Sequence, residues 1–235
     1  MIPGIGAAIG GFEQAAGAPP AAPITYIGRS QAAASGGTVT YASAPLSAPA
    51  ADRLVVVVIT GESVGNYTTT GVSVGGTALT RWSPGRIQLF TAIVSYFEIY
   101  YGIVASGSAP NIVMTTTAER ASMDVYCCSG LSATPVDQVS KTSASGTSCA
   151  INDVETKVGG ALIAGIAAQG TGASVTESWT GTDSVVEDSD QSASMTNTST
   201  AAAHIATTVA ATTDDFTFTL SASKTFVGGA ISFGP

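Results

Sequence analysis

The sequence is poor in charged residues, which make up only 10% of its 235 positions. Acidic side chains number 16 against 8 basic ones, so the formal net charge is −8. Such a chain is a poor ligand for nucleic acid, because contacts with phosphate supply much of that affinity. It is equally unsuited to an anionic membrane surface. We interpret the acidic excess as a source of solubility for a surface otherwise rich in hydroxyl groups.

Cysteine is also scarce. Cys127, Cys128 and Cys149 are odd in number, which argues against a disulfide framework. Adjacent residues of a strand point to opposite faces, so Cys127 and Cys128 should not line the same site. A disulfide bond between Cys149 and either of them remains an alternative. We favour three reduced thiols that serve as small apolar side chains.

The chain has no uninterrupted apolar run close to the roughly 20 residues of a membrane-spanning helix. Met1–Gly10 is apolar, but no Lys or Arg precedes it, so it does not match a secretory signal. We therefore expect a protein that is made in a cytoplasm and stays soluble until it is assembled.

Residues 1–23 differ in composition from the rest of the chain. Gly, Ala and Pro dominate them, and the closing cluster Ala18–Pro23 cannot belong to a central strand. We interpret this segment as an extended N-terminal arm that binds a partner surface, with a disordered tail as the alternative. Residues 24–235 have the length of one all-β domain.

What the chain does contain is a series of short β-branched runs separated by Ser, Thr, Ala and Gly. Leu54–Ile59 is continuously apolar, which predicts a strand buried on both faces or at the centre of a sandwich. Val72–Leu79 predicts a hairpin, because Gly75 and Gly76 suit a tight turn between two β-branched runs.

Further segments extend this pattern. Ile87–Val104 is too long for one straight strand, so we expect two strands or one strand bent by a bulge. Gly160–Ala168 is predicted as a strand, because its glycines disfavour a helix. The polar segment Ser132–Asn152 is predicted as a long surface loop.

The C-terminal part predicts two more strands, Phe216–Leu220 and Phe226–Phe233, with a turn at Ser221–Lys224 between them. Short strands spaced roughly 8–12 residues apart, without a fixed repeat, are typical of an all-β fold. We therefore predict an antiparallel β-sandwich of the jelly-roll kind, preceded by the extended arm.

One motif suggests catalysis. Gly61–Gly65 matches G-x-S-x-G and directly follows an apolar strand, as the nucleophile elbow of a serine hydrolase does. That elbow requires a helix next, whereas the residues that follow are β-branched and include Gly71. The sole histidine, His204, lies in the right chain order for a triad. We interpret the motif as a polar loop and keep a hydrolase using Ser63 as a remote alternative.

Other polar residues suggest no site. His204 has neither a second histidine nor a nearby cysteine, so we predict a surface or edge-strand residue rather than a zinc ligand. The cluster of Asp183, Glu187, Asp188 and Asp190 lacks the spacing of a calcium loop, and we predict a solvated turn. We expect no catalytic residue, metal or cofactor.

The aromatic residues leave one binding hypothesis open. Trp82 and Trp179 lie among polar residues, and a flat aromatic ring beside hydroxyl groups can stack on a sugar. Tyrosines within residues 96–101 are further candidates. Most single tryptophans are instead anchors in a core or at its rim.

The chain from Ile24 to Pro235 resembles the β-sandwich accessory proteins of tailed bacteriophages. Three features support the resemblance: the strand Leu54–Ile59 followed by Val72–Thr80, the run Asp124–Tyr126 leading to Ser129–Ser132 and Thr134–Val136, and the closing strand Phe226–Phe233.

The resemblance implies a non-enzymatic structural protein on the exterior of a virion, of the capsid decoration or cement type, made in the host cytoplasm. It implies attachment through the N-terminal arm to the major capsid protein or to neighbouring copies, and a homo-oligomer, with a trimer as one option. The alternative is a tail-fibre or head-spike module that binds a receptor or a host-surface glycan. Neither nucleic acid nor a membrane is an expected partner.

Overall fold

The computed structural model describes residues 24–33, 37–65, 67–90, 93–169, 177–191, 198–208 and 213–235. These residues form strands and no helix, and every strand pair is antiparallel. The predicted all-β antiparallel fold is thus confirmed. The predicted arm, residues 1–23, lies outside the described residues. No helix in the described part of the chain could cross a membrane.

The strands form three sheets. Sheet A has the order β1 (Ile24–Ala33), β10 (Arg120–Cys128), β3 (Leu54–Ser63), β8 (Val94–Ile103), β6 (Thr80–Arg81), with β7 (Ile87–Phe90) also paired to β8. Sheet B has the order β2 (Gly37–Tyr41), β9 (Ile112–Thr116), β4 (Thr69–Val74), β5 (Thr77–Ala78). Sheet C has the order β11 (Pro135–Glu155), β16 (Thr213–Phe233), β12 (Ala161–Gln169), β15 (Thr198–Ala206), β14 (Val186–Gln191), with β13 (Glu177–Gly181) also paired to β16.

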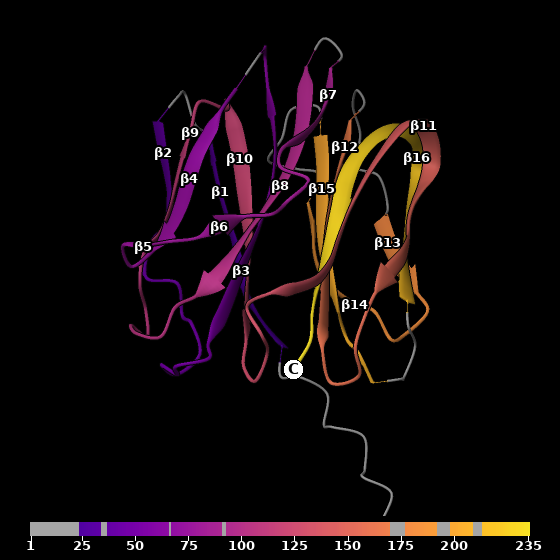
Figure 1. The fold of residues 1–235 in the computed structure, drawn as a ribbon. Helices are drawn as coiled ribbons and strands as arrows, with labels where there is room; N and C mark the ends of the chain where they lie inside the picture. Colours follow the sequence, from indigo (N-terminus) through magenta and orange to yellow (C-terminus); the bar gives the residue numbers. More distant parts are fainter. Residues whose placement is uncertain are drawn as a thin grey trace, which may run out of the picture.

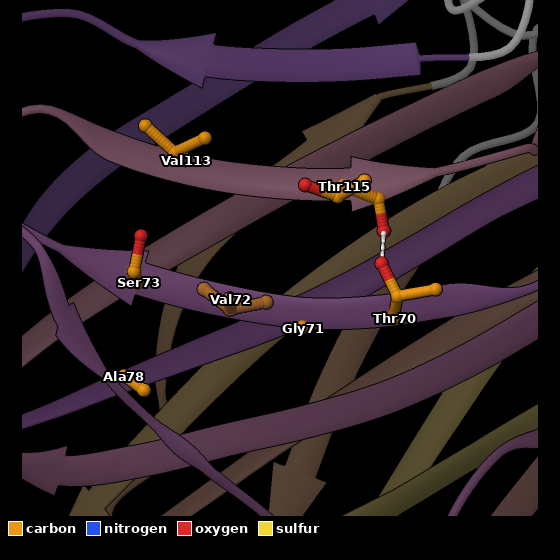
Figure 2. A pocket seen from close by; sticks show the side chains of 7 residues that line it. All are labelled: Thr70, Gly71, Val72, Ser73, Ala78, Val113 and Thr115. Atoms are coloured by element: carbon orange, nitrogen blue, oxygen red, sulfur yellow. Dashed lines mark hydrogen bonds between the residues drawn. The ribbon is translucent and has the colours of Figure 1, made fainter.

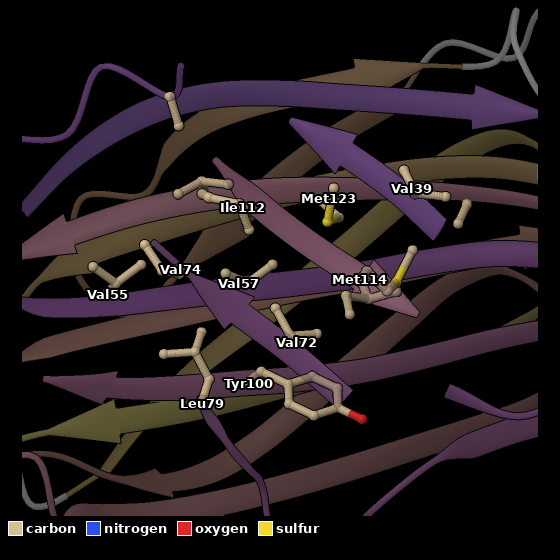
Figure 3. Close-up of a cluster of buried hydrophobic side chains, with 14 of the residues drawn as sticks. Val39, Val55, Val57, Val72, Val74, Leu79, Tyr100, Ile112, Met114 and Met123 are labelled. Carbon is tan, nitrogen blue, oxygen red and sulfur yellow. The ribbon is translucent and has the colours of Figure 1, made fainter. Parts of the chain in front are cut away.

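Sheet A is the middle layer, with sheet B on one face and sheet C on the other (Figure 1). Strand β3 shows why its sequence is continuously apolar. Val55 and Val57 point into the core between sheets A and B (Figure 3), to which Ile59 also belongs. The alternating residues Leu54, Val56 and Val58 belong to the core between sheets A and C. The prediction of a strand buried on both faces is confirmed.

A third core lies within sheet C, because this sheet bends over itself. Strands β11 and β16 are paired over most of their 21 residues each, and their register shifts between Ser143 and Ser148. Beyond the bend, Phe216 and Phe218 pack with Trp179 over the outer face of β12 and β15. Sheet C therefore covers its own outer face.

Two predictions fail at this bend. Ser132–Asn152 is mostly strand β11 rather than a loop, and the expected turn at Ser221–Lys224 is continuous strand within β16. Both segments consist mainly of small and polar residues, which leave no apolar pattern, and the long pairing of β11 with β16 gives them strand geometry all the same.

Other local predictions are confirmed. Val72–Leu79 contains the β4–β5 hairpin, with Gly75 at φ 56° and Gly76 at φ 86°, as a primed turn requires. Ile87–Val104 contains two strands, β7 and β8, and Gly160–Ala168 lies largely in β12. The jelly-roll detail is not confirmed, because the described strands form three sheets where a jelly roll has two.

Sheets A and C lie in close contact at Gly165 of β12. A Cβ atom there would lie 2.5 Å from Val58 Cγ1 and 2.9 Å from Phe97 Cε2, both in sheet A. We expect Gly165→Ala to lower the free energy of unfolding by about 1–3 kcal/mol, because the layers cannot separate without losing their packing. Urea denaturation measures the change. Gly71→Ala is the control, since no atom lies within 4 Å of its added Cβ. Equal stability of the two variants would contradict the prediction.

Candidate functional site

The G-x-S-x-G motif does not form a nucleophile elbow. Strand β3 continues through Ser63, which is buried, so residues 61–63 are strand rather than the predicted polar loop. The next regular element is the strand β4, not a helix. His204 packs against the ring of Tyr126, whose strand partner is Val56. Ser63 lies seven residues beyond Val56, roughly 23 Å along the strand, so it cannot pair with His204.

His204 is not the surface or edge residue that we predict. Its strand, β15, lies between β12 and β14, and the side chain is largely buried. Nδ1 of His204 lies 2.7 Å from Oδ2 of Asp188, and the hydroxyl of Tyr126 donates to the same oxygen at 2.9 Å. Asp188 therefore belongs to strand β14 and to a buried network, not to a solvated turn.

A second acidic residue extends this network between sheets A and C. Asp124 of β10 is fully buried. Its carboxylate accepts hydrogen bonds from Nη2 of Arg29 at 2.7 Å, from the hydroxyl of Tyr26 at 2.9 Å and from that of Ser189 at 2.8 Å. Arg29 also donates from Nη1 to Oγ1 of Thr200 at 3.0 Å. We call these residues, together with Tyr126, Asp188 and His204, the polar seam, because they join β1 and β10 to β14 and β15.

The local backbone explains how two residues of β1 reach Asp124. The register of β1 against β10 shifts between Tyr26 and Gly28, so Tyr26 and Arg29 face the same side. Burial lowers the pKa of Arg29, but the charge and hydrogen bonds of Asp124 outweigh it and raise that pKa above its usual value. The guanidinium is therefore held as a cation inside the seam.

We expect Asp124→Ala to lower the free energy of unfolding by about 3–5 kcal/mol, because it leaves the Arg29 charge buried without its partner. Urea denaturation at neutral pH measures the loss, and Glu119→Ala, an exposed acidic residue, is the control. The double variant Arg29→Met with Asp124→Leu should recover most of the stability, since neither charge then remains. A single variant as stable as the control would contradict this assignment.

A buried acid of a different kind lies between sheets A and B. Glu98 of β8 is fully buried, and its Oε2 accepts a hydrogen bond from Tyr100 at 3.1 Å. Its Oε1 has no hydrogen-bond partner, and the nearest cation, Nη1 of Arg81, is 3.9 Å from Oε2. Burial raises the pKa of Glu98, while hydrogen bonds from Thr69 and Tyr100 and the charges of Arg81 and Arg86 oppose the rise.

The raised pKa of Glu98 predicts how stability changes with pH. The folded protein holds this proton more tightly than the unfolded chain, so its contribution is complete below the unfolded value of 4.5 and is lost as the pH rises through the folded pKa. We expect the stability of Glu98→Gln to fall less with rising pH, so that the variant becomes more stable relative to the wild type as the pH rises. Urea denaturation across this pH range tests it, with Glu119→Gln as the control. Parallel pH profiles for wild type and Glu98→Gln would refute it.

The cysteines match the sequence prediction. All three are free and buried, with Cys127 in the core between sheets A and B and Cys128 in the core between sheets A and C. Burial raises the pKa of Cys128 to about 12 and that of Cys149 to about 11. The thiols are therefore apolar core residues rather than nucleophiles.

The aromatic candidates for sugar binding are in the cores. Trp82 packs edge-on against Phe97 with ring centroids 5.2 Å apart, and Trp179 is buried against Phe216 and Phe218. Tyr96 and Tyr100 are buried as well. Trp82, Trp179, Tyr96 and Tyr100 are thus core residues that cannot stack on a sugar. Tyr101, the remaining candidate, is half-buried and packs edge-on against Phe233 with ring centroids 5.5 Å apart.

Sheet B differs from sheets A and C because its strands carry no charged residue, a property that no local motif reveals. Residues 37–51, 67–79 and 105–118, which include the four strands of sheet B, contain no Asp, Glu, Lys, Arg or His, whereas the connections to sheet A contain Asp52, Arg53 and Glu119. The 16 acidic and 8 basic side chains all lie elsewhere in the chain. One whole layer of an acidic protein is thus uncharged. Charge-free stretches are visible in the sequence, but only the fold unites them in one sheet.

The inner and outer faces of sheet B differ sharply. Val39, Val72, Val74, Ile112 and Met114 point inward against sheet A (Figure 3). The outward residues are exposed or half-buried and consist mainly of hydroxyl side chains: Thr38, Thr40, Thr70, Ser73, Val113 and Thr115. We call these outward side chains the hydroxyl face.

The hydroxyl face contains a shallow hollow of about 240 Å³ (Figure 2). It is bordered by Thr70, Ser73 and Thr115, and it exists because Gly71 and Ala78 offer little side-chain bulk. Oγ1 of Thr70 donates to the carbonyl of Thr115 at 3.4 Å. The surface can thus donate and accept hydrogen bonds but cannot form an ion pair.

No family model matches this chain, and no curated protein or solved structure matches it either. Among the described residues, no three His, Cys, Asp or Glu side chains are grouped as metal ligands. The hydroxyl face of sheet B is distinguished by its hydroxyl side chains and its lack of charged residues.

Proposed function

We propose that this chain is a non-enzymatic structural protein of a bacteriophage virion, a decoration or cement protein on the outside of the particle. The uncharged layer formed by sheet B carries the proposal. Charged residues are depleted at the centres of protein–protein interfaces, because burying an unpaired charge is costly. The sequence resemblance to phage accessory proteins points in the same direction.

The packing of the domain suits this role. Three cores stacked in one short chain leave little apolar side chain exposed, and Val64 and Val186 are the only large hydrophobic side chains exposed among the described residues. The hydrogen bonds of the polar seam join sheets A and C at the edge where β1 contacts β14. A protein that stays outside a particle benefits from such packing, since proteolysis requires local opening of the chain.

The residues that the competing functions would require are separated from one another or buried. A serine hydrolase would need Ser63 and His204 side by side, and they belong to distant parts of two layers. A glycan-binding tail-fibre or head-spike module would have used Trp82 and Trp179, which are buried. That module remains the alternative, and the hollow of the hydroxyl face and the half-buried Tyr101 are the features that could serve it.

Attachment to the particle can be tested with the protein and purified virions of the encoding phage. We expect mass spectrometry and immunogold electron microscopy to find the chain on the particle exterior. Deleting residues 1–23 should abolish rebinding to particles stripped of the chain, while urea denaturation shows an intact domain, because the arm is the proposed attachment segment. Its absence from purified particles would refute the virion role. Normal rebinding of the truncated chain would refute attachment through the arm.

A further inference from the structure

We infer that the hydroxyl face of sheet B is a self-association surface, and that its occupant is the same face of a second copy of this chain. The inference rests on the proposed role in an assembly and adds the partner of this surface. It assigns different tasks to two parts of the protein. The arm attaches the chain to the particle, and sheet B joins neighbouring chains.

Charge favours a second copy as the occupant. Each copy carries a net charge of −8, so two copies repel through most of their surfaces. The strands of sheet B carry none of that charge, so contact through their outer face desolvates no ionised group. A partner that recognises this protein through ion pairs would instead bind the acidic layers.

Hydrogen-bonding chemistry favours it as well. Thr70, Ser73 and Thr115 each offer a hydroxyl group, which is both a donor and an acceptor. A face of hydroxyl groups is therefore its own chemical complement, as a two-fold contact between identical surfaces requires. The described residues of the face include no exposed aromatic ring on which a sugar could stack.

The size of the face determines the strength of the contact. Three strands of five or six residues and the two-residue strand β5, about 4.8 Å apart, cover on the order of 300 Å². A stable interface buries about 800 Å² on each partner. Pairing through the hydroxyl face is therefore weak in free solution. It becomes effective when an attached arm holds copies side by side, since tethering raises the local concentration into the millimolar range.

Sedimentation velocity over a wide range of protein concentration tests the inference on the intact chain. We expect the weight-average sedimentation coefficient of the wild type to rise toward that of a dimer. Thr115→Arg, at the centre of the face, should weaken this association at least about tenfold, because two guanidinium groups then oppose each other. Thr142→Arg places the same charge on an exposed threonine of β11 and should behave as the wild type. Urea denaturation confirms that both variants are folded.

Cysteine cross-linking detects the weak contact independently. The chain's own thiols are buried, so Thr115→Cys introduces the reactive one. Oxidation of Thr115→Cys should give a disulfide-linked dimer, and oxidation of Thr142→Cys should not. The inference is overturned if the wild type shows no association, if both arginine variants associate equally, if the associated species is a trimer, or if neither or both cysteine variants cross-link.

Two further outcomes separate this inference from the proposed function. If deletion of residues 1–23 abolishes self-association and Thr115→Arg does not, the arm rather than sheet B joins the copies, and the inference fails while the virion role stands. If copies pair through Thr115 but the chain is absent from particles, the virion role fails and the surface assignment stands.

Discussion

The burial of sheet A on both faces is the constraint on which the rest of the fold depends. A strand covered on both sides cannot alternate apolar and polar residues in the usual way, so each polar side chain that it carries needs a partner inside the protein. Thr60 and Ser122 bond to each other at 2.6 Å, and Asp124 receives Arg29. The part of β3 that carries no polar side chain, Leu54–Ile59, consists of Val, Leu and Ile alone.

The same constraint gives the two fully buried acids different roles. Asp124 is surrounded by donors from both layers, so its charge is part of what holds sheets A and C together. Glu98 lies between sheets A and B with one oxygen unpartnered, and burial favours its neutral form. The contact between sheets A and C thus includes a buried ion pair, whereas the acid between sheets A and B has a pKa that burial raises.

This division fits the distribution of charge over the whole molecule. The ion pairs of the described residues belong to sheets A and C, and the strands of sheet B pack on sheet A through apolar side chains. Arg53 and Arg86 bond backbone carbonyls in the segments beside these strands. The result is a domain with one uncharged side. The candidates Ser63 and His204 are separated, so the fold does not bring them together as a catalytic pair.

The sequence by itself determined the β-rich class, the doubly buried strand Leu54–Ile59, the Gly75–Gly76 hairpin and the burial of the cysteines, because these follow from local periodicity and side-chain chemistry. Tertiary structure alone decided the third sheet, the strand character of residues 135–155 and the place of His204. Their residues are Ser, Thr and Ala, or a lone polar group, whose environment is set by partners far along the chain. Asp188 and His204 become a pair only when β14 joins β15, and three uncharged stretches become one surface only when sheet B forms.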